Sequence, residues 1–405
     1  MDKWLSVVGI GDDGLAGLSP VAMSHLQQAR LIVGGKRHLA MLADDKLEGD
    51  DRPQIAWSGP IADTITQILT HRPTPTCILA SGDPMCYGIG TTLMRHLPLT
   101  EMTIFPAPSA FSLACSRLGW PLPEVETISL CGRDPALLNA VMYPGAKILV
   151  LSSDRTTPAT VANCLIEKGY GNTQMTVLEH LGGPQERQIQ GLARDWTHTD
   201  MQNLNTIALE CPPDVLGFTR FPGLPDDAYQ HDGQLTKREV RAITLSTLAP
   251  KPGELLWDVG GGSGSISIEW MRHHHRCQAI TIESHPERLR TIAHNAANLG
   301  VPNLQIIDGR APAALQNRPT PDAIFIGGGL TVEGVFETCW ATLKPGGRLV
   351  ANGFTVQTEQ RLFELQQIYG GELNRIAIQR AQPIGKFLGW KSLAPVTQWC
   401  VTKLQ

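Results

Sequence analysis

Three acidic residues in the second half of the chain each stand at the end of a short apolar run: Asp258, Glu283 and Asp308. The carboxyl ends of successive parallel strands meet at one edge of an α/β sheet. Carboxylates at that edge can accept hydrogen bonds from the ribose hydroxyls of a bound nucleotide. This spacing predicts a binding site for a nucleotide-like ligand, with Glu283 placed to accept both ribose hydroxyls.

A glycine turn follows the first of these acids. Three alternating glycines, Gly260, Gly262 and Gly264, come after Asp258, and an amphipathic segment begins at Ile266. Glycines adopt positive φ and let a ligand approach without meeting a Cβ, and the helix behind offers unpaired N–H groups. A dinucleotide-binding turn needs Gly-x-Gly-x-x-Gly. Serines stand at the last position of both possible alignments, so the turn does not favour a nicotinamide cofactor.

The pattern Asp-x-Gly-x-Gly-x-Gly resembles motif I of the class I S-adenosylmethionine-dependent methyltransferases. The turn Lys344-Pro-Gly-Gly before an apolar run is also typical of that family. This resemblance implies that Asp308 and Gly309 lie near the adenine. The triplet at residues 327–329 is all glycine and offers no side chain to an amine acceptor. It suits a large substrate whose own carbon is the nucleophile.

Four segments of the first half of the chain form a different pattern. They are Val-Val-Gly-Ile-Gly, Ser-Gly-Asp-Pro-x-x-Tyr-Gly, Pro-Ala-Pro-Ser and Ser-Leu-Cys-Gly-Arg. Together they resemble the tetrapyrrole methylases, a second and unrelated class of S-adenosylmethionine enzyme. Cys131 departs from the family pattern, which has a histidine there. Ser19 can cap a helix that begins at Pro20, and Ser109 can cap a helix over 110–118. The resemblance implies cofactor contacts, largely through main chain, at Gly9, Gly11, Gly82, Asp83, Met85, Tyr87 and Ser109.

Length and composition limit the possible functions. A chain of 405 residues exceeds one typical domain, and a net charge of -4 with a pI near 6.3 gives no general attraction to nucleic acid or anionic membranes. The nine cysteines form no regular framework, which favours reduced thiols. No apolar run approaches the length of a membrane span. We therefore expect a cytoplasmic protein.

The expected fold class is α/β with two domains. A two-lobed tetrapyrrole methylase domain over 1–212 is followed by a linker over 213–232, which is rich in Pro, Gly and Asp. A class I methyltransferase domain with a Rossmann-like fold covers 233–405.

Several charged residues are candidates for catalysis or substrate binding. Arg133, Arg241 and Arg310 are the predicted clamps for carboxylates, since Arg binds them bidentately. Thr236 and Glu239 can form a capping box at a helix start, and the resemblance places this helix beside the cofactor pocket. The histidines at 273–275 splay around a helix end, so we expect no metal site. Asp12 and Asp13 are expected in a solvated loop.

The two resemblances together indicate the decarboxylating precorrin methyltransferases of cobalamin biosynthesis. They imply methylation of precorrin-6B, or its cobalt form, at C-5 and C-15 with loss of the ring C acetate carboxyl group, giving precorrin-8. One S-adenosylmethionine would bind in each domain, and related enzymes suggest a homo-oligomer. One alternative is a fused methyltransferase for another acceptor such as RNA. The other is a cofactor-sensing protein without catalysis.

Overall fold

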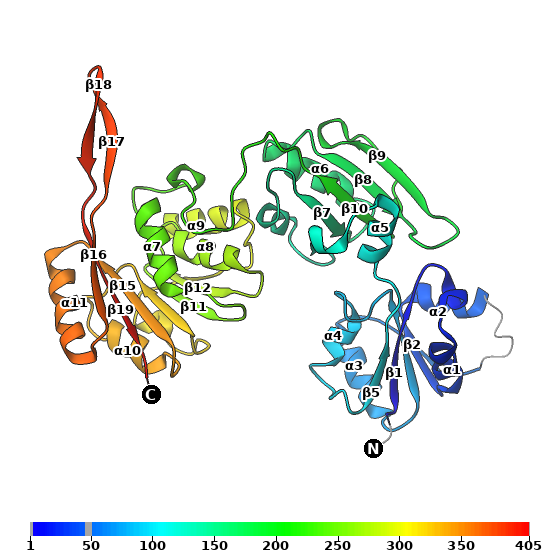
Figure 1. The fold of residues 1–405 in the computed structure, drawn as a ribbon. Helices are drawn as coiled ribbons and strands as arrows, with labels where there is room; N and C mark the ends of the chain where they lie inside the picture. Colours follow the sequence, from blue (N-terminus) through cyan, green and yellow to red (C-terminus); the bar gives the residue numbers. More distant parts are fainter. Residues whose placement is uncertain (1–2, 45–50, 405) are drawn as a thin grey trace. The chain divides into compact units, whose positions relative to one another are not determined.

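The computed structural model describes residues 3–44 and 51–404 and divides the chain into two compact units (Figure 1). The first unit holds residues 1–135 and 144–215, and the second holds 136–143 and 216–405. Both units combine sheets with flanking helices, so the predicted α/β class is confirmed. Within the described ranges, no helix has both the length and the apolar character needed to cross a membrane.

The first lobe of the first unit is a five-stranded parallel sheet with the order β3-β2-β4-β1-β5. Its strands are β1 (Leu5–Ile10), β2 (Leu31–Gly34), β3 (Gln54–Ala56), β4 (Thr76–Ser81) and β5 (Met102–Phe105). Its helices are η1 (Gly14–Gly17), α1 (Pro20–Gln28), α2 (Lys36–Asp44), α3 (Ile61–Thr70) and α4 (Ile89–Leu93). Ser19 caps α1 as predicted, because its side chain accepts the N–H of Ala22 at 3.2 Å.

Strand β1 is buried on both faces, as expected for a parallel sheet between helices. Leu5 and Val7 belong to an apolar cluster with residues of α3 and α4. Val8 and Ile10 point the other way and pack with residues of α1. This alternation fixes the strand, and with it the loop that follows Ile10.

The second lobe is a five-stranded mixed sheet with the order β6-β7-β10-β8-β9, in which only β6 and β7 run parallel. Its strands are β6 (Glu126–Ser129), β7 (Lys147–Leu151), β8 (Gln174–Glu179), β9 (Arg187–Leu192) and β10 (Asn205–Glu210). Its helices are α5 (Ala110–Leu118), η2 (Leu122–Glu124), α6 (Thr157–Glu167) and η4 (Ala193–Asp195). Ser109 caps α5 as predicted, through a bond from Ser112 N at 3.1 Å.

The second unit is built on a seven-stranded sheet with the order β13-β12-β11-β14-β15-β19-β16. The first five strands in this order are parallel and the last two pairings are antiparallel. The strands are β11 (Leu255–Val259), β12 (Gln278–Glu283), β13 (Gln305–Asp308), β14 (Ala323–Ile326), β15 (Arg348–Gly353), β16 (Glu372–Ile376) and β19 (Val396–Thr402). The helices are η3 (Pro135–Ala140), η5 (Asp226–Ala228), α7 (Arg238–Leu248), α8 (Ser265–His273), α9 (Pro286–Asn298), η6 (Ala313–Leu315), α10 (Val335–Thr342) and α11 (Val356–Tyr369).

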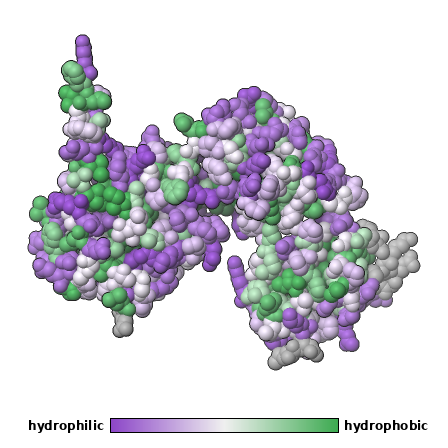
Figure 2. Space-filling model, viewed as in Figure 1, coloured by the Kyte–Doolittle hydropathy of each residue, from purple (hydrophilic) through white to green (hydrophobic). Residues whose placement is uncertain are grey.

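A separate antiparallel hairpin, β17 (Gln379–Ile384) and β18 (Phe387–Ser392), projects from the sheet of the second unit (Figure 1). It carries four large exposed apolar side chains, and green regions lie below its purple tip in Figure 2. They are Ile384, Phe387, Leu388 and Trp390.

The predicted linker is only partly a connection. Leu224 and Tyr229 lie within 213–232, yet both are buried in the core of the second unit. The boundary between the units falls between Val215 and Leu216. The Pro, Gly and Asp content of the segment concealed these two core residues, because it breaks the apolar periodicity without preventing burial.

Candidate active site

The three glycines of the turn after β11 all have positive φ, at 80° for Gly260, 58° for Gly262 and 78° for Gly264. A Cβ on Gly260 would lie 2.9 Å from the backbone nitrogen of Gly328, in the loop after β14. A Cβ on Gly264 would meet a methyl of Ile292 on α9 at the same distance. This turn, the glycine cradle, is therefore packed closely against backbone and core, at φ values that only glycine adopts readily.

Asp258 is almost completely buried, with 1% of its surface exposed. One carboxylate oxygen accepts hydrogen bonds from the hydroxyl of Ser267 at 2.6 Å and from the N–H of Ser267 at 3.3 Å. Desolvation raises the pKa of Asp258 to about 6. This carboxylate faces the start of α8, so Asp258 holds the glycine turn against its helix. In the predicted cofactor site, the role of Asp258 is therefore to hold the turn in shape.

Glu283 ends β12 and accepts three backbone N–H groups: those of Gly262 at 2.9 Å, Ser284 at 2.8 Å and His285 at 2.9 Å. A carboxylate offers roughly four acceptor positions. In this arrangement about one acceptor position remains for a ligand. The sequence predicts that Glu283 binds both ribose hydroxyls, and this would require the carboxylate to release the N–H of Gly262.

Asp308 and Arg310 are both exposed beside this edge of the sheet. Glu283 and Asp308 are direct partners in the register of β12 and β13, and the N–H of Gly309 donates to the carbonyl of Glu283 at 3.0 Å. The structure thus brings the predicted residues Glu283, Asp308 and Gly309 together.

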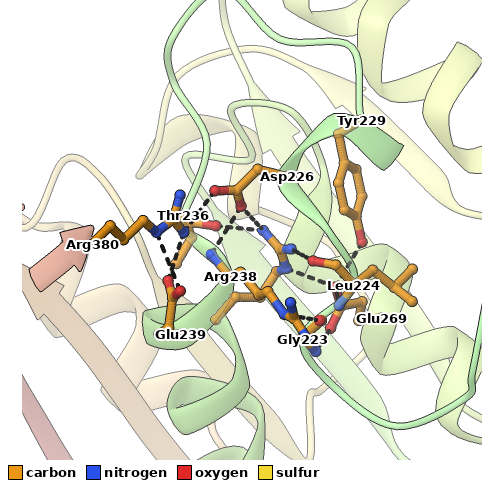
Figure 3. Close-up of polar contacts among 10 residues, drawn as sticks. Gly223, Leu224, Asp226, Tyr229, Thr236, Arg238, Glu239, Glu269 and Arg380 are labelled. Atoms are coloured by element: carbon orange, nitrogen blue, oxygen red, sulfur yellow. Dashed lines mark hydrogen bonds and ion pairs between the residues drawn. The ribbon is translucent and has the colours of Figure 1, made fainter. Parts of the chain in front are cut away.

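The start of α7 differs from the sequence prediction. The N-cap is Lys237, with no side-chain hydrogen bond, so the predicted capping box of Thr236 and Glu239 is not formed. Glu239 instead accepts two bonds from Arg380 of β17, at 2.6 and 3.2 Å (Figure 3). An ion pair with a side chain 141 residues away has replaced the local contact.

Arg241 is completely buried and pairs with the buried carboxylate of Glu269 at 2.6 Å. It also donates to the carbonyls of Leu224 and Thr236. Glu269 accepts from Tyr229 and from the N–H groups of Gly223 and Leu224 as well, and these bonds tie residues 223–241 to α8 (Figure 3). Arg241 therefore does not present its guanidinium to a substrate, and its predicted role as a carboxylate clamp does not agree with this location.

The first unit contains a cavity of about 890 Å³ between its two lobes. Six of the predicted residues line it: Gly11, Gly82, Asp83, Tyr87, Ser109 and Arg133. Gly9 and Met85 do not line the cavity. A Cβ on Gly9 would lie 2.0 Å from the carbonyl oxygen of Gly82, so Gly9 permits close approach of the two glycine loops.

Tyr87 and Arg133 contact each other across this cavity. The guanidinium carbon of Arg133 lies 5.0 Å from the centre of the Tyr87 ring, a cation–π contact. Tyr87 has a φ of 55°, which is rare outside glycine, and its hydroxyl donates to the carbonyl of Thr127 at 3.5 Å. Burial raises the pKa of Tyr87. Asp83 shapes the loop before it by accepting the N–H of Met85 at 2.8 Å.

The expectation of a solvated loop at Asp12 is wrong. Its side chain is 12% exposed, lines the cavity, and binds Arg37 and His180. Beside Arg37, burial lowers the pKa of His38 to about 4, so this ring is neutral and its Nε2 accepts from Arg37. Sequence reasoning missed these residues because the partners lie 25 and 168 positions from Asp12. The sequence did contain one indication of this site, the adjacent acids Asp12 and Asp13 after a strand.

Two family models match the chain. Residues 5–196 match "Tetrapyrrole (Corrin/Porphyrin) Methylases" and residues 227–403 match "Precorrin methyltransferase domain". A precorrin-6Y C(5,15)-methyltransferase [decarboxylating] from Sinorhizobium sp. is 47% identical over 406 residues, covering 100% of this chain and 97% of that protein. The chain belongs to this family of decarboxylating precorrin-6Y C(5,15)-methyltransferases.

Two shorter relatives in the precorrin series are each similar to part of the chain. The cobalt-precorrin-7 C(5)-methyltransferase of Salmonella typhimurium is 30% identical, covering 45% of this chain and 88% of that protein. A probable cobalt-precorrin-6B C(15)-methyltransferase (decarboxylating) of Saccharolobus solfataricus is 33% identical, covering 34% of this chain and 72% of that protein.

Several solved structures are similar to part of the chain. The C-terminal domain of precorrin-6Y C5,15-methyltransferase from Rhodobacter capsulatus is 44% identical, with a TM-score of 0.44, and covers 46% of this chain and 100% of that structure.

Proposed function

We propose that the chain methylates a precorrin at C-5 and C-15 and removes carbon dioxide from the acetate of ring C. The observation that carries this proposal is the full-length similarity to a methyltransferase of that name, in a chain with a candidate cofactor site in each unit. No comparable support exists for an RNA acceptor, because the net charge is -4.

The two reactions divide between the units. The second unit carries the C-15 methylation and the decarboxylation, and the first carries the C-5 methylation. Two observations support this division. The family models separate at the unit boundary, and the two shorter relatives are named for one of the two positions each.

Each unit holds one S-adenosylmethionine. In the second unit the glycine cradle presents no side chain to such a ligand, and Glu283 and Asp308, which are partners at the sheet edge, would bind the ribose and the adenine. In the first unit Gly11, Gly82 and Asp83 line a cavity large enough for cofactor and substrate contacts. The cofactor supplies an electrophilic methyl group when bound.

The chain's own residues contribute position and charge. A reduced bridge carbon conjugated to ring nitrogens is already nucleophilic, so the glycine triplet 327–329 need not supply a base. Arg310 in the second unit and Arg133 in the first bind peripheral carboxylates of the macrocycle. Correct placement of a substrate can contribute several kcal/mol to lowering a barrier, on the order of 7–11 kcal/mol in favourable cases.

We further propose that the protein acts in the cytoplasm as a homo-oligomer. Its nine cysteines are all free, which suits a reducing compartment. The apolar hairpin β17–β18 offers a surface that a second copy would cover.

Titration of S-adenosylhomocysteine into the whole protein tests the two-site proposal. Wild type should bind two equivalents. Glu283→Gln and Gly260→Ala should each abolish or weaken one site by at least about tenfold, and Asp83→Ala should weaken the other. Mass spectrometry of precorrin-6B turnover then tests the reaction. A single site in wild type, or a product that gains one methyl group without losing carbon dioxide, would contradict the proposal.

A further inference from the structure

Asp12 connects the two lobes of the first unit. It lies directly after β1 of the first sheet, in the loop that lines the cavity. Its Oδ1 accepts from Nη1 of Arg37 at 2.7 Å, and its Oδ2 lies 2.8 Å from Nδ1 of His180. Because a carboxylate can only accept, Nδ1 of His180 carries the proton of that bond.

His180 belongs to the second lobe and is fixed by its backbone. It follows β8 directly, and its N–H donates to the carbonyl of Leu204 at 3.1 Å. Its φ is 50°, a conformation that non-glycine residues rarely adopt. This backbone directs the ring toward Asp12, and a rare conformation held in place by its surroundings is a common feature of functional sites.

Gly183 lets the carboxylate of Asp12 approach the second lobe. A Cβ on Gly183 would lie 2.4 Å from Oδ2 of Asp12. The turn after β8 is therefore shaped around this carboxylate, in addition to the hydrogen bond from His180.

Arg37 extends the contact through the first lobe. Its Nη2 lies 3.1 Å from Nε2 of His38 and donates to the hydroxyl of Ser81 at 3.3 Å. Arg37 and His38 lie at the start of α2, which follows β2, and Ser81 ends β4; these two strands are neighbours in the sheet that also contains β1. The loops after three adjacent strands are thus connected to His180 through Asp12.

We propose that Asp12 and His180 are positioning residues that fix the separation of the two lobes, and with it the placement of the tetrapyrrole for C-5 methylation. The bond joins opposite walls of the cavity, since Leu178 and Leu181 on either side of His180 also line it. The Tyr87–Arg133 contact joins the same lobes elsewhere on the cavity wall. This inference rests on the proposed function for its substrate, and on contacts within the first unit for its geometry.

Three variants separate the bond from its surroundings. His180→Gly removes the ring and tolerates the positive φ. His180→Asn also tolerates it and places an amide N–H where Nδ1 stands, so it serves as the conservative rescue. Gly183→Ala deletes neither partner but displaces the carboxylate of Asp12. Arg72→Ala is the matched control, because it breaks a short ion pair with Glu101 in the first lobe, and neither residue lines the cavity.

The readout is the ratio of C-5 to C-15 methylation by mass, with KM and kcat for the C-5 step in the full-length enzyme. His180→Gly and Gly183→Ala should raise KM for the C-5 step by about tenfold, the effect expected for loss of a charge-assisted hydrogen bond. His180→Asn should stay within about twofold of wild type in KM, and Arg72→Ala should leave KM unchanged. Unchanged C-5 kinetics in both disruptive variants, or an equal loss in His180→Asn and His180→Gly, would overturn the inference.

Hydrogen exchange decides the geometry without turnover. Amides of the loop after β1 and of residues 180–183 should exchange faster in His180→Gly than in wild type, and Arg72→Ala should leave them unchanged. If wild type failed to methylate precorrin, the proposed function would be wrong, but this measurement would still test the bridge, the hydrogen bond between Asp12 and His180. Unaltered exchange in His180→Gly would overturn the bridge even if turnover were normal.

Discussion

Two carboxylates at the same sheet edge have opposite surroundings in this protein. Glu283 accepts three backbone N–H groups, which stabilise its charge. Asp258 is more deeply buried, and it accepts hydrogen bonds from the hydroxyl and the N–H of Ser267. Both carboxylates therefore lie at a strand end, but the role of each depends on the groups around it. Glu283 is suited to a ligand and Asp258 to holding a helix.

The raised pKa of Asp258 predicts a pH-dependent effect of Asp258→Asn on stability. A carboxyl whose pKa rises from 3.8 to about 6 on folding stabilises the protein below about pH 4, and this contribution is lost as the pH rises through 6. Between pH 4 and pH 7.5 the variant should therefore gain about 2 kcal/mol in unfolding free energy relative to wild type. Urea unfolding of both proteins at several pH values measures this difference. A difference that does not change with pH would contradict the assignment.

Residue types and spacing were enough to predict the glycine turn and the acids around it. They were not enough to predict the partners of Asp12, Glu239 or Arg241. A strand end fixes where a side chain begins, but the contact it makes depends on residues far away in the chain. Arg380 reaches Glu239 from 141 positions away, and His180 reaches Asp12 from 168. No local pattern contains that information.

At the scale of elements, helix starts with a serine N-cap were predicted correctly at Ser19 and Ser109, because that contact spans three residues. Strand β11 was also predictable, since both of its faces are buried and an apolar run leads to Asp258. The fold of the segment before α7 was not predictable from the sequence. Its folding depends on the buried ion pair of Arg241 with Glu269, which a loop-like composition conceals.

This ion pair predicts that Arg241→Ala strongly destabilises the second unit. The change would leave the carboxylate of Glu269 buried without its cation, a loss on the order of 3–5 kcal/mol. Thermal unfolding measures it, with the transition of the first unit as an internal standard. Arg310→Ala is the control, since this side chain is exposed and its removal should change stability by less than about 0.5 kcal/mol. A loss below about 1 kcal/mol in Arg241→Ala would show that the network does not hold the segment.

At the scale of the whole molecule, two unrelated α/β designs occur in one chain. The first unit has its cavity between two lobes, and the second has its glycine turn at the carboxyl edge of a single sheet. Both use glycines where a Cβ would collide with backbone, at Gly9 and at Gly260. A substrate that must be methylated at two bridge carbons presents two different surroundings, and two independent sites can each be shaped to one of them.

The hairpin β17–β18 gives a prediction about assembly. Leu388 and Trp390 point to one face and Phe387 to the other, and all three are at least 73% exposed. A two-stranded hairpin is marginally stable in water by itself, and each further copy brings the same apolar surface and unpaired strand edges. We therefore expect the hairpin to be covered by the hairpin of a second copy.

Leu388→Ser combined with Trp390→Ser should reduce the mass in light scattering from that of an oligomer to the 44.0 kDa monomer. The matched control is Phe363→Ser with Ile368→Ser, two exposed apolar residues of α11, which should leave the mass unchanged. Binding of S-adenosylhomocysteine should persist in both double variants, because neither touches the glycine cradle. A monomeric wild type at micromolar concentration, or an unchanged mass in the hairpin variant, would exclude assembly through this surface, and the exposed side chains would then have to meet a different partner.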